Sequence, residues 1–118
     1  MADILFLLRQ PPYDGARAIE ALDAVFVAGV FEQNVSVLFK DDGVWQLVNG
    51  QAGDRLGVRT QGKVVAALPE YEVTRIYVCA TSLAERHLVA ADLVLPVILL
   101  DAAGQRALMA TQQAVVND

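Results

Sequence analysis

The chain has 118 residues, of which 55% are hydrophobic and 19% are charged, and its formal net charge is −5. This length and hydrophobicity predict one folded domain, residues 1–118, and exclude a disordered chain. The acidic balance excludes the basic face that direct nucleic-acid binding requires. Because the charged fraction is below that of ordinary soluble domains, we expect a partner subunit or a membrane to cover the excess apolar surface.

The membrane alternative fails on the length of the apolar runs. A membrane-spanning helix needs roughly 20 apolar residues in succession, and the longest apolar stretches, Ala24–Phe31 and Leu93–Leu100, are far shorter. Asp3 precedes the first apolar run without a basic segment, so the sequence does not predict a signal peptide. We therefore expect a cytoplasmic protein that has no contact with a membrane.

The first third of the chain predicts two strands around a long helix. Ile4–Leu8 is a continuous apolar run, typical of a strand covered on both faces of a parallel sheet. A helix is predicted over Ala16–Val30 with Asp14 as its N-cap, and Val35–Phe39 predicts a second strand. Because the charges of this helix form only a narrow stripe, we expect it to be buried by its own sheet and by another subunit. These charges recur at every third residue: Arg17, Glu20 and Asp23.

The remainder of the chain continues the alternation of strands and helices. A turn at Asp41–Gly43 leads into the short apolar segment Val44–Val48, and a helix is predicted near Gly62–Leu68, ended by Pro69. The further elements predicted are the strand Ile76–Cys79, the helix Ala80–Arg86 capped by Thr81 or Ser82, the strand Leu95–Leu100 with Pro96 near its start, the helix Ala102–Gln112 weakened by Gly104, and the strand Ala114–Val116. This order predicts an open three-layer α/β/α sandwich.

Three features have the spacing of functional motifs but fail on chemistry. The Gly57–Lys63 stretch has the glycine spacing of a P-loop, but Val64 replaces the Ser or Thr that holds Mg²⁺. Asp41 and Asp42 before a glycine are ordinary turn residues, which we prefer to a cation site. The single histidine, His87, follows two charged residues and is typical of a solvated helix end. We predict no metal site and no organic cofactor.

Cys79 is the one residue that keeps a functional interpretation. As the only cysteine it excludes an internal disulfide and a multi-cysteine metal site. It ends a predicted strand and precedes a predicted helix, where ligands gather in open α/β sheets and where a thiolate is stabilised. A buried, inert cysteine fits the same position equally well. Both interpretations stay open on position alone.

Three segments in register resemble the DsrE/DsrF-like sulfur-relay family, in its TusC/DsrF branch. Asp42–Leu47 followed by Gly50–Gln51 is similar to the family's D-G-V-x-Q-L…G-Q segment. Glu20–Ala24 is similar to its E-G-L-D-A, and Tyr77–Arg86 to its C-A-A-S-L-x-E-R stretch. The resemblance covers nearly the whole chain. It implies a three-layer α/β/α domain with a five-stranded, mostly parallel sheet.

The resemblance also implies a function within a hetero-oligomer. TusB-like, TusC-like and TusD-like subunits form a dimer of heterotrimers that takes persulfide sulfur from a TusA-like carrier. The complex passes this sulfur toward a TusE-like acceptor for 2-thiolation of tRNA wobble uridine. DsrE, DsrF and DsrH counterparts serve sulfur oxidation instead, which is an open alternative. The chain is then an accessory or non-catalytic subunit of a sulfurtransferase complex.

The resemblance implies that the sulfur-carrying cysteine belongs to the TusD/DsrE sister subunit. Cys79 of this chain occupies the matching position. The sequence places no basic residue beside Cys79, because Arg75 lies at the far end of the strand and Arg86 two turns into the helix. The helix terminus is then the only group expected to stabilise the thiolate, and we expect Cys79 to have a minor part in the relay. A free-standing homo-oligomeric thiol sulfurtransferase and a flavodoxin-like binding domain are the alternatives.

Overall fold

The computed structural model describes residues 2–12, 16–31, 34–48 and 61–118. Five parallel strands form one sheet in the order β4-β3-β2-β1-β5. They are β1 (Asp3–Leu8), β2 (Asn34–Phe39), β3 (Arg75–Cys79), β4 (Ile98–Leu100) and β5 (Ala114–Asn117). The α/β/α fold with a five-stranded parallel sheet is therefore confirmed.

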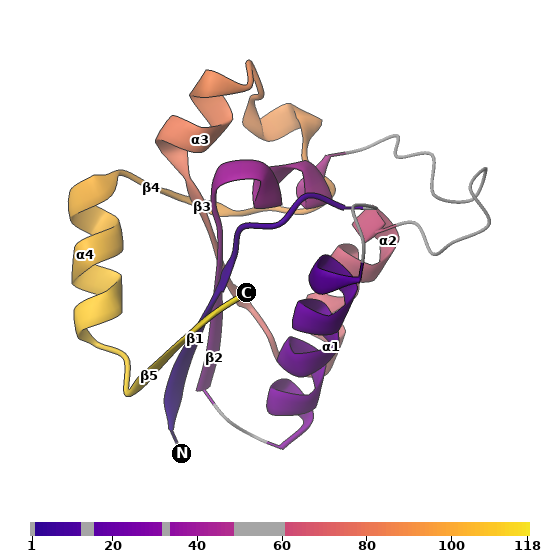
Figure 1. Ribbon diagram of the computed structural model, residues 1–118, viewed down its shortest axis with the longest axis vertical. Coiled ribbons are helices and arrows are strands. Elements are labelled where there is room, and N and C mark those ends of the chain that lie inside the picture. Colours follow the sequence, from indigo (N-terminus) through magenta and orange to yellow (C-terminus); the bar gives the residue numbers. More distant parts are fainter. Residues whose placement is uncertain (1, 13–15, 32–33, 49–60) are drawn as a thin grey trace.

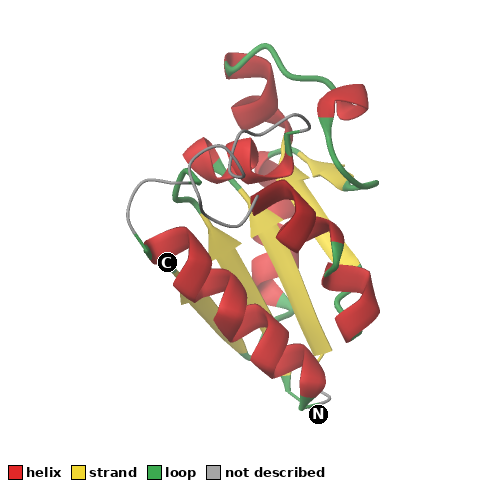
Figure 2. Cartoon of the chain, turned by 90° about the vertical axis from the view of Figure 1, so that its right-hand side faces the viewer, coloured by secondary structure: helices red, strands yellow, loops and turns green. Residues whose placement is uncertain are grey.

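Helices cover both faces of the sheet (Figure 1). On one face lie α1 (Arg17–Val30) and α2 (Gln61–Ala66), and Figure 2 shows α1 lying along the strands. On the other face lies α4 (Ala102–Ala110). The chain moves stepwise from β1 to β4 and then returns to pair β5 with β1. Because parallel crossovers are right-handed, reversing the direction of travel places α4 on the opposite face from α1.

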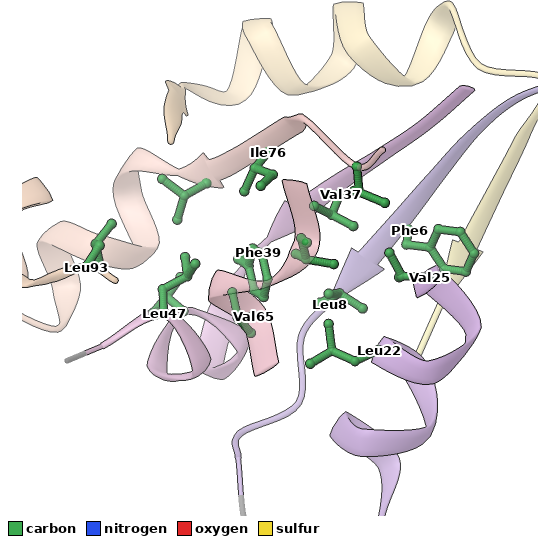
Figure 3. Close-up of a cluster of buried hydrophobic side chains, with 14 of the residues drawn as sticks. Phe6, Leu8, Leu22, Val25, Val37, Phe39, Leu47, Val65, Ile76 and Leu93 are labelled. Atoms are coloured by element: carbon green, nitrogen blue, oxygen red, sulfur yellow. The ribbon is translucent and has the colours of Figure 1, made fainter. Parts of the chain in front are cut away.

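The main core lies between the sheet and α1, α2 and their neighbours (Figure 3). Phe6 and Leu8 of β1 and Phe39 of β2 meet Leu22 and Val25 of α1. All of these side chains are buried, and Leu5 and Leu7 are buried on the other face, which explains the unbroken apolar run of β1. A smaller cluster on the α4 face contains Leu5, Leu7 and Leu38, with Tyr77, Leu108 and Met109 packed against it.

Residues 41–48 differ from the sequence prediction of a turn and an apolar segment. Asp41–Leu47 is a 3-10 helix, η1, which directly follows β2. Gly43 makes this possible, because a Cβ atom there would lie 1.8 Å from the carbonyl oxygen of Leu8. Val44 and Leu47 of η1 point into the main core. Val44 and Leu47 of the predicted apolar segment are thus buried by a helical turn against β1.

The fourth strand is shorter than the predicted Leu95–Leu100. Val94 donates its N–H to the carbonyl of Leu47 at 2.7 Å, and Leu93 forms an antiparallel bridge with Val48. These residues therefore bond to the η1 region instead of β3. Pro96 has no N–H to continue a ladder, and β4 begins at Ile98.

The helices also refine the predicted boundaries. The 3-10 helix η3 (Leu68–Tyr71) follows α2, with Pro69 in its first turn, and α3 (Ala80–Glu85) follows β3. The 3-10 helix η4 (Ala90–Asp92) precedes β4, and α4 ends two residues before its predicted end. Of the predicted caps, Asp14 lies outside the described residues, and the N-cap of α1 is Ala16. In the described part of the chain, no helix is long and apolar enough to cross a membrane.

A candidate thiol site at the carboxyl edge of the sheet

Cys79 lies where β3 ends and α3 begins. It is itself the N-cap residue of α3, so the prediction of Thr81 or Ser82 as the cap is wrong. Strand residues alternate between faces, and Cys79 follows two residues after Tyr77, which packs on the α4 side. The sulfur therefore belongs to the face that α4 covers. The residue is only 5% exposed.

Two buried polar side chains lie beside the sulfur. Ser82, on the first turn of α3, is 4% exposed, and its Oγ accepts the N–H of Asp41 at 2.9 Å. This bond leaves the hydroxyl hydrogen free to point at Cys79. Gln105 of α4 is 5% exposed, and its Nε2 donates to the carbonyl of Leu100 at 3.1 Å. Leu100 is the residue of β4 paired with Cys79, so this contact holds the Gln105 amide next to the cysteine.

These groups change the acidity of the thiol. Burial raises the pKa of Cys79, because it disfavours the charged thiolate. The Ser82 hydroxyl and backbone N–H, the Gln105 side chain and the Thr81 backbone N–H act in the opposite direction. They stabilise the thiolate and bring the pKa below its ordinary value of 9.0. The expectation that only the helix terminus would stabilise the thiolate is therefore wrong.

A network of charges fixes the surroundings of Ser82. Arg86 donates to Asp42 Oδ1 from Nη2 at 2.9 Å and from Nε at 3.3 Å, and its Nη1 donates to the carbonyl of Ser82 at 3.1 Å. Asp41 pairs with Arg9 at 2.8 Å. Asp41 has a φ of 52°, a left-handed conformation that Asp tolerates and that directs its N–H toward Ser82. The arrangement ties η1, and with it the end of β2, to α3.

The other features singled out in the sequence have structural roles or lie elsewhere. The two aspartates form the ion pairs above, and within the described ranges no group of three or more His, Cys, Asp or Glu residues could hold a metal ion. His87 is exposed and sits in a left-handed turn directly after α3. Of the P-loop-like stretch, residues 57–60 lie outside the described residues, and Lys63 is on α2.

Sequence reasoning missed the two polar neighbours of Cys79. The position of Ser82 gave a weak indication, because the side chain of an N-cap residue commonly contacts the third residue of its helix. Gln105 gave none, since it lies on another helix and follows Cys79 by about a quarter of the chain. Together they lower the pKa of the Cys79 thiol, which is shielded from solvent. A thiolate of this kind can attack a sulfane sulfur, and its shielding limits which donors reach it.

Comparisons with known proteins agree with this fold. The model of the DsrE/DsrF-like family matches residues 2–117. The chain is 43% identical over 90 residues to the "Intracellular sulfur oxidation protein DsrF" of Allochromatium vinosum, covering 76% of this chain and 66% of that relative. It is 38% identical over 114 residues to the "Protein TusC homolog" of Pseudomonas aeruginosa, covering 97% and 96%.

A solved structure has the same fold throughout. The crystal structure of the YchN protein from E. coli superimposes with a TM-score of 0.87 over the whole of both chains, at 15% sequence identity. At this identity the likeness bears on the fold alone. The family match, in contrast, includes nearly every residue of the sequence, from the first strand to the last. The chain therefore belongs to the DsrE/DsrF-like family.

Proposed function

We propose that the chain is a subunit of a hetero-oligomeric sulfur relay. In this role it works with TusB-like and TusD-like sister subunits, and the assembly takes persulfide sulfur from a TusA-like carrier and passes it toward a TusE-like acceptor. The end product is 2-thiouridine at the wobble position of tRNA. The observation that carries the proposal is the match to a TusC homolog over 97% of this chain and 96% of that relative.

Sulfur oxidation is the second candidate function. The relative named DsrF, an intracellular sulfur oxidation protein, is 43% identical to the aligned part of this chain, against 38% for the TusC homolog. The two pathways share the transfer of sulfane sulfur between protein thiols and differ in the final acceptor. Deleting the gene in its host separates them, because loss of tRNA 2-thiouridine is expected for the first pathway and loss of sulfur oxidation for the second.

The exposed apolar surface supports an assembly. On α1 and directly after it, Val27, Val30 and Phe31 are 56%, 60% and 70% exposed. A groove of about 270 Å³ opens beside α1, with Phe6, Leu8 and Val116 in its lining. Ile98 and Leu99 are exposed on β4, at the opposite edge of the sheet. Apolar patches of this kind mark protein interfaces, which fits a subunit with neighbours on both sides.

Within this relay we propose Cys79 as a sulfur-accepting thiol. Its thiolate attacks the terminal sulfur of a donor persulfide, R–S–SH, so that a new S–S bond forms at Cys79 while the donor S–S bond breaks. The donor leaves as the thiolate R–S⁻, and Cys79 becomes a persulfide without any net oxidation. The lowered pKa of Cys79 favours this attack at neutral pH.

Co-expression with the two sister subunits tests the assembly. We expect the chain alone to aggregate or self-associate and the three chains together to co-purify. Val27→Ser should weaken co-purification, whereas Arg106→Ser, a change to an exposed residue on α4, should leave it intact. A soluble, stable monomer that binds neither sister subunit would contradict the proposal. In the assembled complex, Cys79→Ser should reduce the transfer of radiolabelled sulfur, and transfer at the wild-type rate would exclude Cys79 as an acceptor.

A further inference from the structure

The helix α4 buries fewer of its own apolar side chains than α1, the long helix on the other face of the sheet. Of its nine residues, the one that is buried is a polar side chain, Gln105. Leu108 and Met109 are half-buried against the small cluster on this face, and the remaining residues are half-buried or exposed. By comparison, α1 buries Ala18, Leu22, Val25 and Gly29. Elements with few buried apolar contacts open locally at low free-energy cost.

This weakly held helix is also the element that closes the face to which Cys79 belongs. Cys79 shares its face of the sheet with Tyr77, and the side chains that pack over this face come from α4. Gln105 Nε2 bonds to Leu100, the register partner of Cys79, so the first turns of α4 lie over the end of β3. Asp101 is the N-cap of α4, and its Oδ1 accepts the N–H of Gly104 at 2.7 Å.

The other neighbours of Cys79 are fixed more firmly. Leu83 anchors α3 in the main core. The 3-10 helix η1 buries Val44 and Leu47, and its Asp42 is tied to α3 through Arg86. Moving either of these elements would disturb the core. Moving α4 would uncover the smaller cluster of Leu5, Leu7 and Leu38 together with the Gln105 amide, and would leave the main core in place.

We propose that α4 is a lid over Cys79, and that local unwinding of this helix gives reagents and donor persulfides access to the thiol. The lid has a role in sulfur transfer only if the proposed function holds, but its opening is a property of this chain alone. Because Cys79 as a residue is 5% exposed, its thiol needs such a movement to meet a persulfide carried on another protein. Since a helix of nine residues is not stable by itself in water, leaving the sheet means unwinding.

The rate at which iodoacetamide alkylates Cys79 measures the opening of α4 directly. The whole chain is used, in the oligomeric state that it forms in solution. Asp101→Ala removes the cap of α4 without touching Cys79, and should speed labelling about fivefold. Asp101→Asn keeps a capping oxygen and is the matched control, with labelling within about twofold of wild type. Leu22→Ala weakens the main core on the opposite face, and so raises global unfolding but not lid opening.

The pattern across the variants separates a lid from global unfolding. The lid predicts faster labelling in Asp101→Ala, little change in Asp101→Asn and Leu22→Ala, and a wild-type rate that hardly responds to urea below the unfolding transition. If Cys79 is labelled only on global unfolding, Leu22→Ala reacts faster than Asp101→Ala and the wild-type rate rises steeply with urea, which overturns the proposal. An Asp101→Ala rate equal to wild type overturns it as well. None of these results depends on sulfur transfer.

Discussion

Replacing Gly43 by alanine tests how the carboxyl edge of the sheet is built. The added Cβ would lie 1.8 Å from the carbonyl oxygen of Leu8 and 2.6 Å from its carbon. Both are backbone atoms of a buried strand, so the side chain cannot be accommodated by a change of rotamer. Relieving the overlap needs η1 to move away from β1 by roughly 1 Å, in a region that is packed like a crystal.

The expected loss of stability follows from what this movement breaks. Overpacking of a core typically costs about 1–3 kcal/mol. The shift also strains the bond from Gly43 N–H to the carbonyl of Lys40 and the bond from Asp41 N–H to Ser82 Oγ, each worth about 1 kcal/mol. We therefore expect Gly43→Ala to lower the free energy of unfolding by about 3 kcal/mol or more. Because Ser82 loses a fixed partner, the pKa of Cys79 should rise as well.

Urea unfolding followed by circular dichroism gives the stability change. The emission of Trp45, two residues away on η1, reports whether the segment has moved in the folded protein. The matched control is Gly104→Ala, whose Cβ would lie 3.1 Å from Leu100 Cδ2 and 3.2 Å from Asp101 Oδ1, side-chain atoms at distances that a shift of a few tenths of an ångström relieves. Alanine also favours the helix by about 1 kcal/mol, so this variant should stay within about 1 kcal/mol of wild type. A Gly43→Ala protein as stable as wild type would refute the reasoning.

Two further predictions concern Cys79. Ser82→Ala should raise the pKa of the thiol toward 9.0 and cost about 1–3 kcal/mol, since it leaves the N–H of Asp41 without its acceptor, whereas Ser82→Thr should restore both. Ultraviolet absorbance of the thiolate is followed against pH, and the signal of Cys79→Ala is subtracted to give the pKa of Cys79. A titration midpoint in Ser82→Ala equal to that of wild type would contradict the role of Ser82 in stabilising the thiolate. Because the folded-state pKa is depressed, the stabilising contribution of Cys79 should be complete above pH 9.0 and be lost as the pH falls through the folded-state pKa. Urea unfolding of wild type and Cys79→Ala at several pH values up to and above 9.0 measures this contribution. The prediction would be contradicted if the free energy of unfolding depended on pH identically in the two proteins.

The linear pattern of residues determined the framework of the protein. The continuous apolar run at β1 requires cover on both faces, which a parallel sheet between helices provides. The same pattern placed Cys79 at the junction of a strand and a helix, because both elements carry their periodicity in adjacent residues. The rejection of a cation site at Asp41 and Asp42 followed from turn chemistry, and in the structure both side chains form ion pairs.

The tertiary structure alone decided the chemistry around that cysteine. Gln105 reaches Cys79 only because α4 returns over the sheet, and Asp41 reaches Ser82 only because β2 and β3 are neighbours. The formation of η1 and the late start of β4 have the same origin, since both depend on contacts between segments far apart in the chain. Local propensity describes a residue and its nearest neighbours. Bonds such as the one from Val94 to Leu47 depend on how the whole chain packs, and no pattern in the sequence records them.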